Sequence, residues 1–142
     1  MKNGLGLIFA TVIACGGSSG GSLNTAMNGT WAGTATLTIS GEASQTLSGQ
    51  LQVAVSGQNA TFTGVCLDGS GAVTAHGSDN SASWSGSLVC PAVQFQCGPV
   101  VMTFQSASAT LNGSTMNAQG AGNAAGCTLS KSFTISLAGT KQ

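Results

Sequence analysis

Side chains able to transfer protons or attack a substrate are scarce in this 142-residue chain. His76 is the only histidine, and Asp79 follows it across an expected turn. A hydrolase needs a nucleophile, a base and an orienting acid in contact, and the chain has no Gly-x-Ser-x-Gly motif. Glu42 and Asp68 also fall in expected turns or loops, where Asp is favoured for backbone reasons. We therefore expect no catalytic residues and a solvated His76, with a paired-carboxylate glycosidase left open.

The first residues have the pattern of an export signal. Lys2 precedes an uncharged apolar run over residues 5–14, which matches the n-region and h-region of a signal peptide. The run is too short for a permanent membrane helix, which takes roughly 20 residues. Val12-Ile13-Ala14-Cys15 resembles the lipobox of bacterial lipoproteins. An ordinary signal peptide cut after Ala14 is the alternative.

The lipobox resemblance implies that residues 1–14 are removed and that Cys15 becomes the first residue, carrying acyl chains such as palmitate. A cysteine suits this role because its thiolate is a strong nucleophile. Two or three acyl chains anchor stably, whereas a single chain would be reversible. Gly16 rather than Asp after this cysteine is typical of sorting to a Gram-negative outer membrane. We expect a lipid-anchored outer-membrane protein that faces the periplasm or the cell surface.

A tether and one domain are expected after the lipidation site. Residues 16–22 read GGSSGGS, and with the residues up to Asn28 they span on the order of 20 Å as a flexible coil. Residues 15–28 are therefore assigned to the lipidated cysteine and tether, and residues 29–142 to a single β domain. The whole chain has only three basic residues. Without a basic patch to displace phosphate counterions, we expect no nucleic-acid partner.

From residue 31 onward, apolar side chains alternate with Thr and Ser. A period of two indicates half-buried strands, and clusters of Gly, Ser and Asn separate them. Eight strands are expected over residues 30–40, 47–55, 62–66, 72–77, 82–90, 99–111, 116–122 and 127–137. A loop is expected over residues 91–97, a hairpin turn at Asn112-Gly113, a bulge between Phe104 and Ala107, and a last turn over residues 122–126.

Eight strands joined by tight turns predict an all-β antiparallel meander. Closure into a small barrel removes bare edges that an uncharged, Thr-rich sheet could not protect from aggregation. Glycines at inward positions, as in Trp31-Ala32-Gly33 and Leu47-Ser48-Gly49, fit a tightly curved sheet. A β-sandwich is the alternative, although it normally needs a longer crossover connection.

Four cysteines of the domain behind an export signal indicate two disulfides formed outside the cytoplasm. Alternating strand directions place Cys66, Cys90, Cys97 and Cys127 at one rim of the barrel. We favour the pairs Cys90–Cys97 and Cys66–Cys127, because Cys90 and Cys97 flank one loop. The pairs Cys66–Cys90 and Cys97–Cys127 stay open. No CxxC spacing suggests a metal site, the segment Asp68–Gly71 lacks the spacing of an EF-hand loop, and no cofactor is implied.

Three residues are candidates for contacting a ligand in the barrel. Trp31 and Trp84 are expected to face inward. Lys131 has inward parity beside Leu129 and Phe133, where its cation could meet an anionic ligand group at the rim. Alternatively the strand bulges and sends Lys131 to solvent, or Lys131 reaches solvent from the rim.

Gly29-Thr30-Trp31 resembles the Gly-x-Trp that opens the first strand of lipocalins and related calycin barrels. In those families the Trp closes one barrel end and packs under a basic residue that follows the last strand, a place that Lys141 could occupy. The resemblance implies an apolar small-molecule cavity. The chain departs from these families in its short length, its lack of Tyr and its interior rich in Gly and Ala.

We expect a non-catalytic binding or structural module of the cell envelope rather than an enzyme. One alternative is a lipocalin-like carrier of a small apolar ligand. Another is an inhibitor or partner of an envelope enzyme, since lysozyme-inhibitor lipoproteins are also small barrels, although their Tyr-containing signature has no match here. A filled interior would favour a structural module, and an open apolar interior would favour a carrier.

Overall fold

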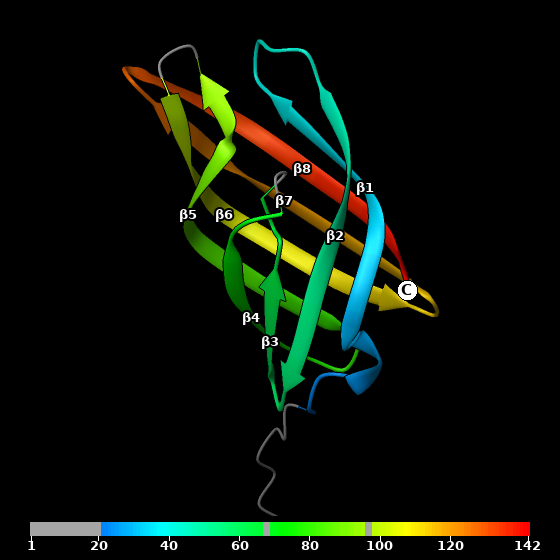
Figure 1. The fold of residues 1–142 in the computed structure, drawn as a ribbon. Helices are drawn as coiled ribbons and strands as arrows, with labels where there is room; N and C mark the ends of the chain where they lie inside the picture. Colours follow the sequence, from blue (N-terminus) through cyan, green and yellow to red (C-terminus); the bar gives the residue numbers. More distant parts are fainter. Residues whose placement is uncertain (1–20, 67–68, 96–97) are drawn as a thin grey trace, which may run out of the picture.

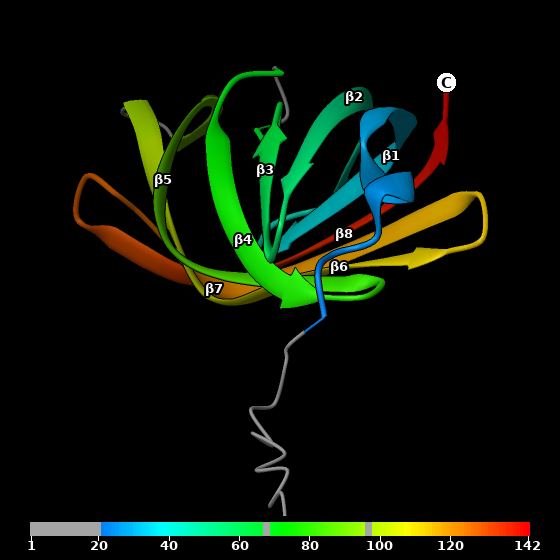
Figure 2. The same ribbon diagram turned by 90° about the horizontal axis from the view of Figure 1, so that it is seen from below.

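The computed structural model describes residues 21–66, 69–95 and 98–142. Eight antiparallel strands, each paired with the next, form a barrel that β8 closes against β1 (Figure 1). The expected all-β meander is confirmed, and the closed ring replaces the sandwich alternative (Figure 2). The elements are η1 (Thr25–Met27), β1 (Gly29–Ile39), β2 (Gln45–Ser56), β3 (Asn59–Thr63), β4 (Ala72–Ser78), β5 (Ser81–Phe95), β6 (Gly98–Asn112), β7 (Thr115–Gly126) and β8 (Leu129–Lys141).

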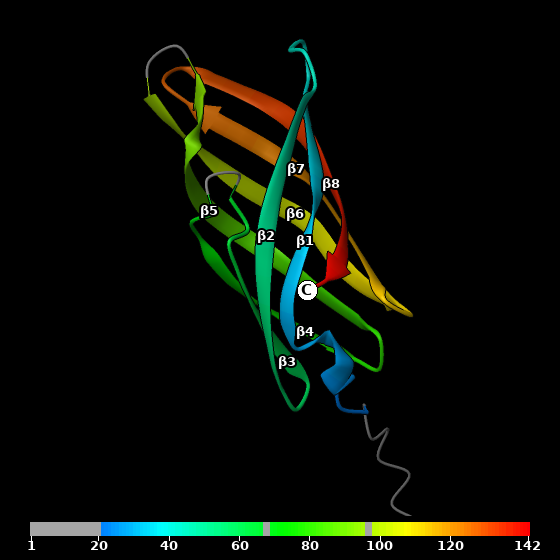
Figure 3. The same cartoon turned by 45° about the vertical axis from the view of Figure 1, so that its right-hand side comes forward.

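The barrel is uneven around its circumference. β5 and β6 have 15 residues each, whereas β3 has 5 and β4 has 7. β4 pairs with β5 only from His76↔Ser83 to Ser78↔Ser81. The N-terminal half of β4 is therefore separated from β5. Figure 3 shows β3 and β4 covering only the lower part of the wall that β2 and β5 span.

Two apolar clusters fill the barrel near its two ends. The cluster beside η1 includes Met27, Trp31 and Met116, all at most 1% exposed. The cluster at the other end includes Leu37 and Phe133, also fully buried. Most members of both clusters occupy inward positions of the strands, as the period-two pattern predicts, and Leu23, Met27 and Cys66 join them from outside the strands.

The folded part begins before Gly29. Leu23 is 2% exposed and donates its backbone N–H to the carbonyl of Gly57 at 2.8 Å, and Met27 is fully buried. The backbone N–H of Asn24 donates to the carbonyl of Asp79 at 2.6 Å. Residues 22–28, which we expected to belong to the flexible tether, instead pack against the barrel because two apolar side chains interrupt the polar segment.

Strand boundaries differ from expectation where long partner strands extend the ladder. β5 continues through Pro91 to Phe95, in place of the expected loop, and β7 continues through the expected turn to Gly126. β5 pairs with β6 again at Gln94 and Phe95 after a register shift. The end of β7 has partners on β6 and β8, and these hydrogen bonds outweigh the local turn preference of Gly and Asn. The bulge between Phe104 and Ser106 and the hairpin after Asn112 are confirmed.

Glycines permit strands to approach closely at several points. A Cβ on Gly33 would overlap the carbonyl oxygen of Ala138 in β8, and a Cβ on Gly122 would overlap that of Thr103 in β6. Gly49, by contrast, has no atom within 4 Å of its would-be Cβ. Glycine at position 33 is therefore explained by the close approach of β8, whereas Gly49 borders open space.

We expect Gly122→Ala to lower the free energy of unfolding by about 2 kcal/mol or more, because the added methyl meets the β6 backbone. Urea denaturation followed by circular dichroism measures this loss. Gly49→Ala is the matched control and should change the value by less than about 0.5 kcal/mol. Equal losses in the two variants would contradict the close-packing explanation.

Candidate functional site

A cavity of about 140 Å³ lies inside the barrel. It occupies the layer between the two apolar clusters, and every strand contributes to its wall. Its lining is predominantly apolar and includes Ala35, Phe62, Val73, Trp84, Ala118 and Ile135.

The cavity exists because small residues occupy inward positions in the middle of the barrel. Ala107 of β6 and Ala118 and Gly120 of β7 line it, as does Gly49 of β2. Bulky side chains at these positions would fill the space, as they do at both ends. The sequence pointed to Trp84 and, through the calycin resemblance, to an apolar cavity, but not to these small residues. Their recurrence at the midpoint of several strands is the signal that could have located them.

Solvent reaches the cavity beside β2. Leu47 and Ser48 line it and are exposed, Leu47 by 38%. Phe104 and Ile135 point inward yet are only half-buried, as expected for side chains that face an open space.

No charged side chain among the described residues lines the cavity. The polar residues of the wall are Ser48, Gln50, Ser108 and Gln119, and all four are uncharged. An ion placed there would lose hydration without meeting an opposite charge, so the arrangement favours an uncharged, largely apolar group.

An aromatic cluster forms part of the wall. The ring centroids of Trp84 and Phe104 are 4.8 Å apart at an interplanar angle of 57°. Phe104 also meets Phe133 edge-on, with centroids 5.0 Å apart and an angle of 81°. Of the three sequence-based ligand candidates, Trp84 is the one that lines the cavity.

Trp31 closes the barrel end beside η1. Its indole Nε1 donates to the carbonyl of Met27 at 2.9 Å. Lys141 lies over the ring, with Nζ 5.7 Å from the centroid, and donates to the carbonyl of Ala26 at 3.0 Å. This is the contact that the Gly-x-Trp resemblance implied. Trp31 is 1% exposed and does not line the cavity.

Lys131 lies at the opposite rim. It pairs with buried Ala124 in an unbroken β7–β8 register, so its inward parity is correct and the bulge alternative is wrong. Its ammonium forms an ion pair with Glu42 in the turn between β1 and β2, and the two side chains are 26% and 50% exposed. Such exposed pairs contribute about 0–1 kcal/mol. Lys131 is outside the cavity wall.

The residues considered for catalysis have structural contacts of other kinds. His76 is exposed on β4, with Nδ1 3.0 Å from Oδ1 of Asn59 on β3. Asp79 has a positive φ of 52° and binds the N-terminal segment through its backbone. Asp68 lies outside the described residues. Within the described part of the chain, no group of three His, Cys, Asp or Glu side chains could hold a metal ion.

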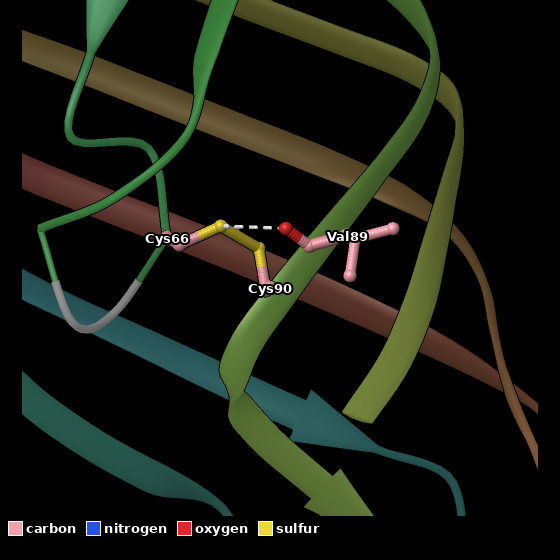
Figure 4. The surroundings of a disulfide bond; sticks show 3 residues. All are labelled: Cys66, Val89 and Cys90. Carbon is pink, nitrogen blue, oxygen red and sulfur yellow. Dashed lines mark hydrogen bonds between the residues drawn. A yellow bond between two sulfur atoms is a disulfide. The ribbon is translucent and has the colours of Figure 1, made fainter. Parts of the chain in front are cut away.

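One disulfide joins Cys66, in the loop after β3, to Cys90 of β5, with Cα atoms 5.3 Å apart (Figure 4). The pairing that we favoured is therefore wrong. Because β5 continues as a strand beyond Cys90, this residue does not border a loop, and its buried side chain faces the loop after β3. Cys127 is also disulfide-bonded, and its partner, like Cys97 and Cys15, lies outside the described residues.

The disulfide compensates for missing ladder contacts on one side of the barrel. It connects the β3–β4 loop to β5 beyond the point where β4 and β5 stop pairing. The Cys66 Sγ atom is also 3.7 Å from the carbonyl oxygen of Val89. This is a packing contact, because a disulfide sulfur has no hydrogen to donate. Cys66 contributes to the cavity wall, so the bond helps to hold that wall in place.

No family model matches the chain, and no curated protein or solved structure matches it either. Across the described residues, no helix has the length and apolar character needed to cross a membrane.

We expect the double substitution Cys66→Ser and Cys90→Ser to lower the free energy of unfolding by about 3.5 kcal/mol, the loop-entropy value for a separation of 24 residues. Guanidinium denaturation without reductant measures the loss. Reduced wild-type protein is the comparison and should lose more, because reduction also breaks the bond of Cys127. A non-reducing peptide map that links Cys66 to Cys127 would contradict the pairing.

Proposed function

We propose that this protein is a non-catalytic binding module that holds a small uncharged apolar ligand inside its barrel. The observation that carries the proposal is the cavity of about 140 Å³ with its predominantly apolar wall. Apolar cavities of about 150 Å³ in other proteins stay dry and bind molecules such as benzene. Ligand sites are commonly apolar pockets, and the mouths of β-barrels are among their frequent locations.

The small residues of the cavity wall support a binding role. An eight-stranded barrel can be filled by its own side chains or can hold one small ligand. This chain places Gly49, Ala107 and Ala118 where larger side chains would fill the space. The closure of one end by Trp31 and Lys141 is also what a lipocalin-like carrier would have.

We propose further that lipid on Cys15 holds the module at the bacterial outer membrane. The support is the sequence of residues 12–15, followed by a run of Gly and Ser. The first described residues attach where β2 ends, since the backbone N–H of Leu23 donates to the carbonyl of Gly57. The cavity opens beside Leu47, near the start of the same strand. An anchor at the N-terminal side would therefore leave the opening accessible.

Binding can be tested with iodobenzene, a neutral probe whose heavy atom quenches nearby indoles. In Trp31→Phe, the remaining Trp84 lines the cavity, so its fluorescence should fall with a saturable dependence on probe concentration. In Trp84→Phe, the remaining Trp31 is buried outside the cavity and should show only weak, linear quenching.

Ala118→Leu provides the control for this titration, because its larger side chain would occupy the cavity. It should abolish the saturable quenching of Trp84 in the Trp31→Phe background. Identical linear quenching of both tryptophans would contradict the proposal. Native mass spectrometry after detergent exchange would then identify any ligand that copurifies.

Lipidation can be tested by metabolic labelling with an alkyne analogue of palmitate in a bacterial host. The wild-type chain should carry the label and fractionate with membranes, because Cys15 is the proposed acylation site. Cys15→Ser should remove both properties, while Ser18→Ala, in the adjacent Gly/Ser run, should retain them. Labelling that survives in Cys15→Ser would contradict this assignment.

A further inference from the structure

We propose that the cavity selects a flat, uncharged aromatic ring and that Phe104 is the residue that gives this selectivity. This inference rests on the proposed function, and it names the class of ligand. It starts from the aromatic part of the wall, formed by Trp84 of β5 and Phe104 of β6, both half-buried.

The local backbone brings the two rings together. The β5–β6 register shifts between Trp84 and Gly86, and the β6–β7 register shifts just after Phe104. Such bulges redirect side chains and are frequent beside functional sites. Here they accompany two neighbouring aromatic rings that face the same interior space.

Glycines hold both rings in place. A Cβ on Gly120 would be 2.9 Å from Cδ1 and Cε1 of Phe104, so the phenyl ring lies directly on the β7 backbone. Gly86 has a φ of 143°, and its would-be Cβ is 3.3 Å from Cζ2 of the Trp84 indole. Phe133, 2% exposed, packs edge-on against Phe104 from the second apolar cluster. The rings are thus fixed before a ligand arrives, which lowers the entropic cost of binding.

A preformed aromatic wall favours an aromatic ligand over an aliphatic one of similar size. Rings 4.5–7 Å apart in tilted or offset geometry attract each other beyond the effect of buried area. Trp84 and Phe104 already adopt this spacing with each other, and a ligand ring beside them would extend the cluster. One such contact corresponds to about a three- to ten-fold gain in affinity. Because no charged side chain among the described residues lines the cavity, benzoate should bind far more weakly than benzene.

The experiment compares the affinities of benzene, cyclohexane and benzoate for the full mature chain, by the NMR shift of the Trp84 indole N–H. We expect benzene to bind about three- to ten-fold more tightly than cyclohexane, and benzoate to give no saturable shift. Phe104→Leu should lower the benzene-to-cyclohexane ratio, because only the Trp84 ring then remains of this pair, while both hydrocarbons still bind. Phe62→Leu is the control, since Phe62 lines the cavity but is only 5% exposed, and it should preserve the ratio.

Gly120→Ala offers a second variant, in case Phe104→Leu does not fold, because the added methyl displaces the phenyl ring. It should also lower the ratio. The selectivity is overturned if the wild type binds benzene and cyclohexane equally, or if the ratio is unchanged in the Phe104 and Gly120 variants. Either result leaves the proposed function standing. If neither hydrocarbon binds, both the selectivity and the proposed function are overturned.

Discussion

The contrast between large side chains at the ends of the barrel and small ones in its middle determines most of what this structure can do. Closing eight strands creates one interior, and two apolar clusters fill its ends, one around Trp31 and the other around Phe133. Each filled end fixes the curvature of the sheet, so the middle layer can stay open without collapse. The cavity is therefore a product of the packing on either side of it, and the open layer depends on both clusters.

The wall of the barrel is uneven because β3 and β4 are short, so the ladder between β4 and β5 includes few pairs. Beyond those pairs, the disulfide between Cys66 and Cys90 joins the β3–β4 loop to β5. At the opposite end, Lys141 contacts both η1 and Trp31 of β1. The disulfide thus lies beside the weakest pairing of the ring, whereas the Lys141 contacts join the N-terminal segment to a well-paired part of it.

The periodicity of the sequence was sufficient to predict the strands, because burial alternates along a sheet whatever its partners. Closure followed from the tight turns and from the need to avoid bare edges in an uncharged sheet. It could not predict where strands end. Gly122 to Gly126 has strong turn character, yet partners on both sides keep it extended. The favoured disulfide pairing was wrong for the same reason: the unpredicted length of β5 determines that Cys90 faces Cys66. At the site, the alternation of inward and outward residues was enough to identify Trp84 as a cavity residue. The same role of Phe104 depends on the β6 bulge, and that of Ala118 depends on the open middle layer of the barrel. Both features appear only when all the strands are aligned.

The short seam between β4 and β5 also has a consequence for motion. Native proteins open locally first where few contacts must break, and only three residues of each strand pair along this seam. Backbone amides of the seam should therefore exchange with deuterated solvent sooner than those of the long β6–β7–β8 ladders. Opening of this kind would separate β4 from β5 while the rest of the barrel stays intact.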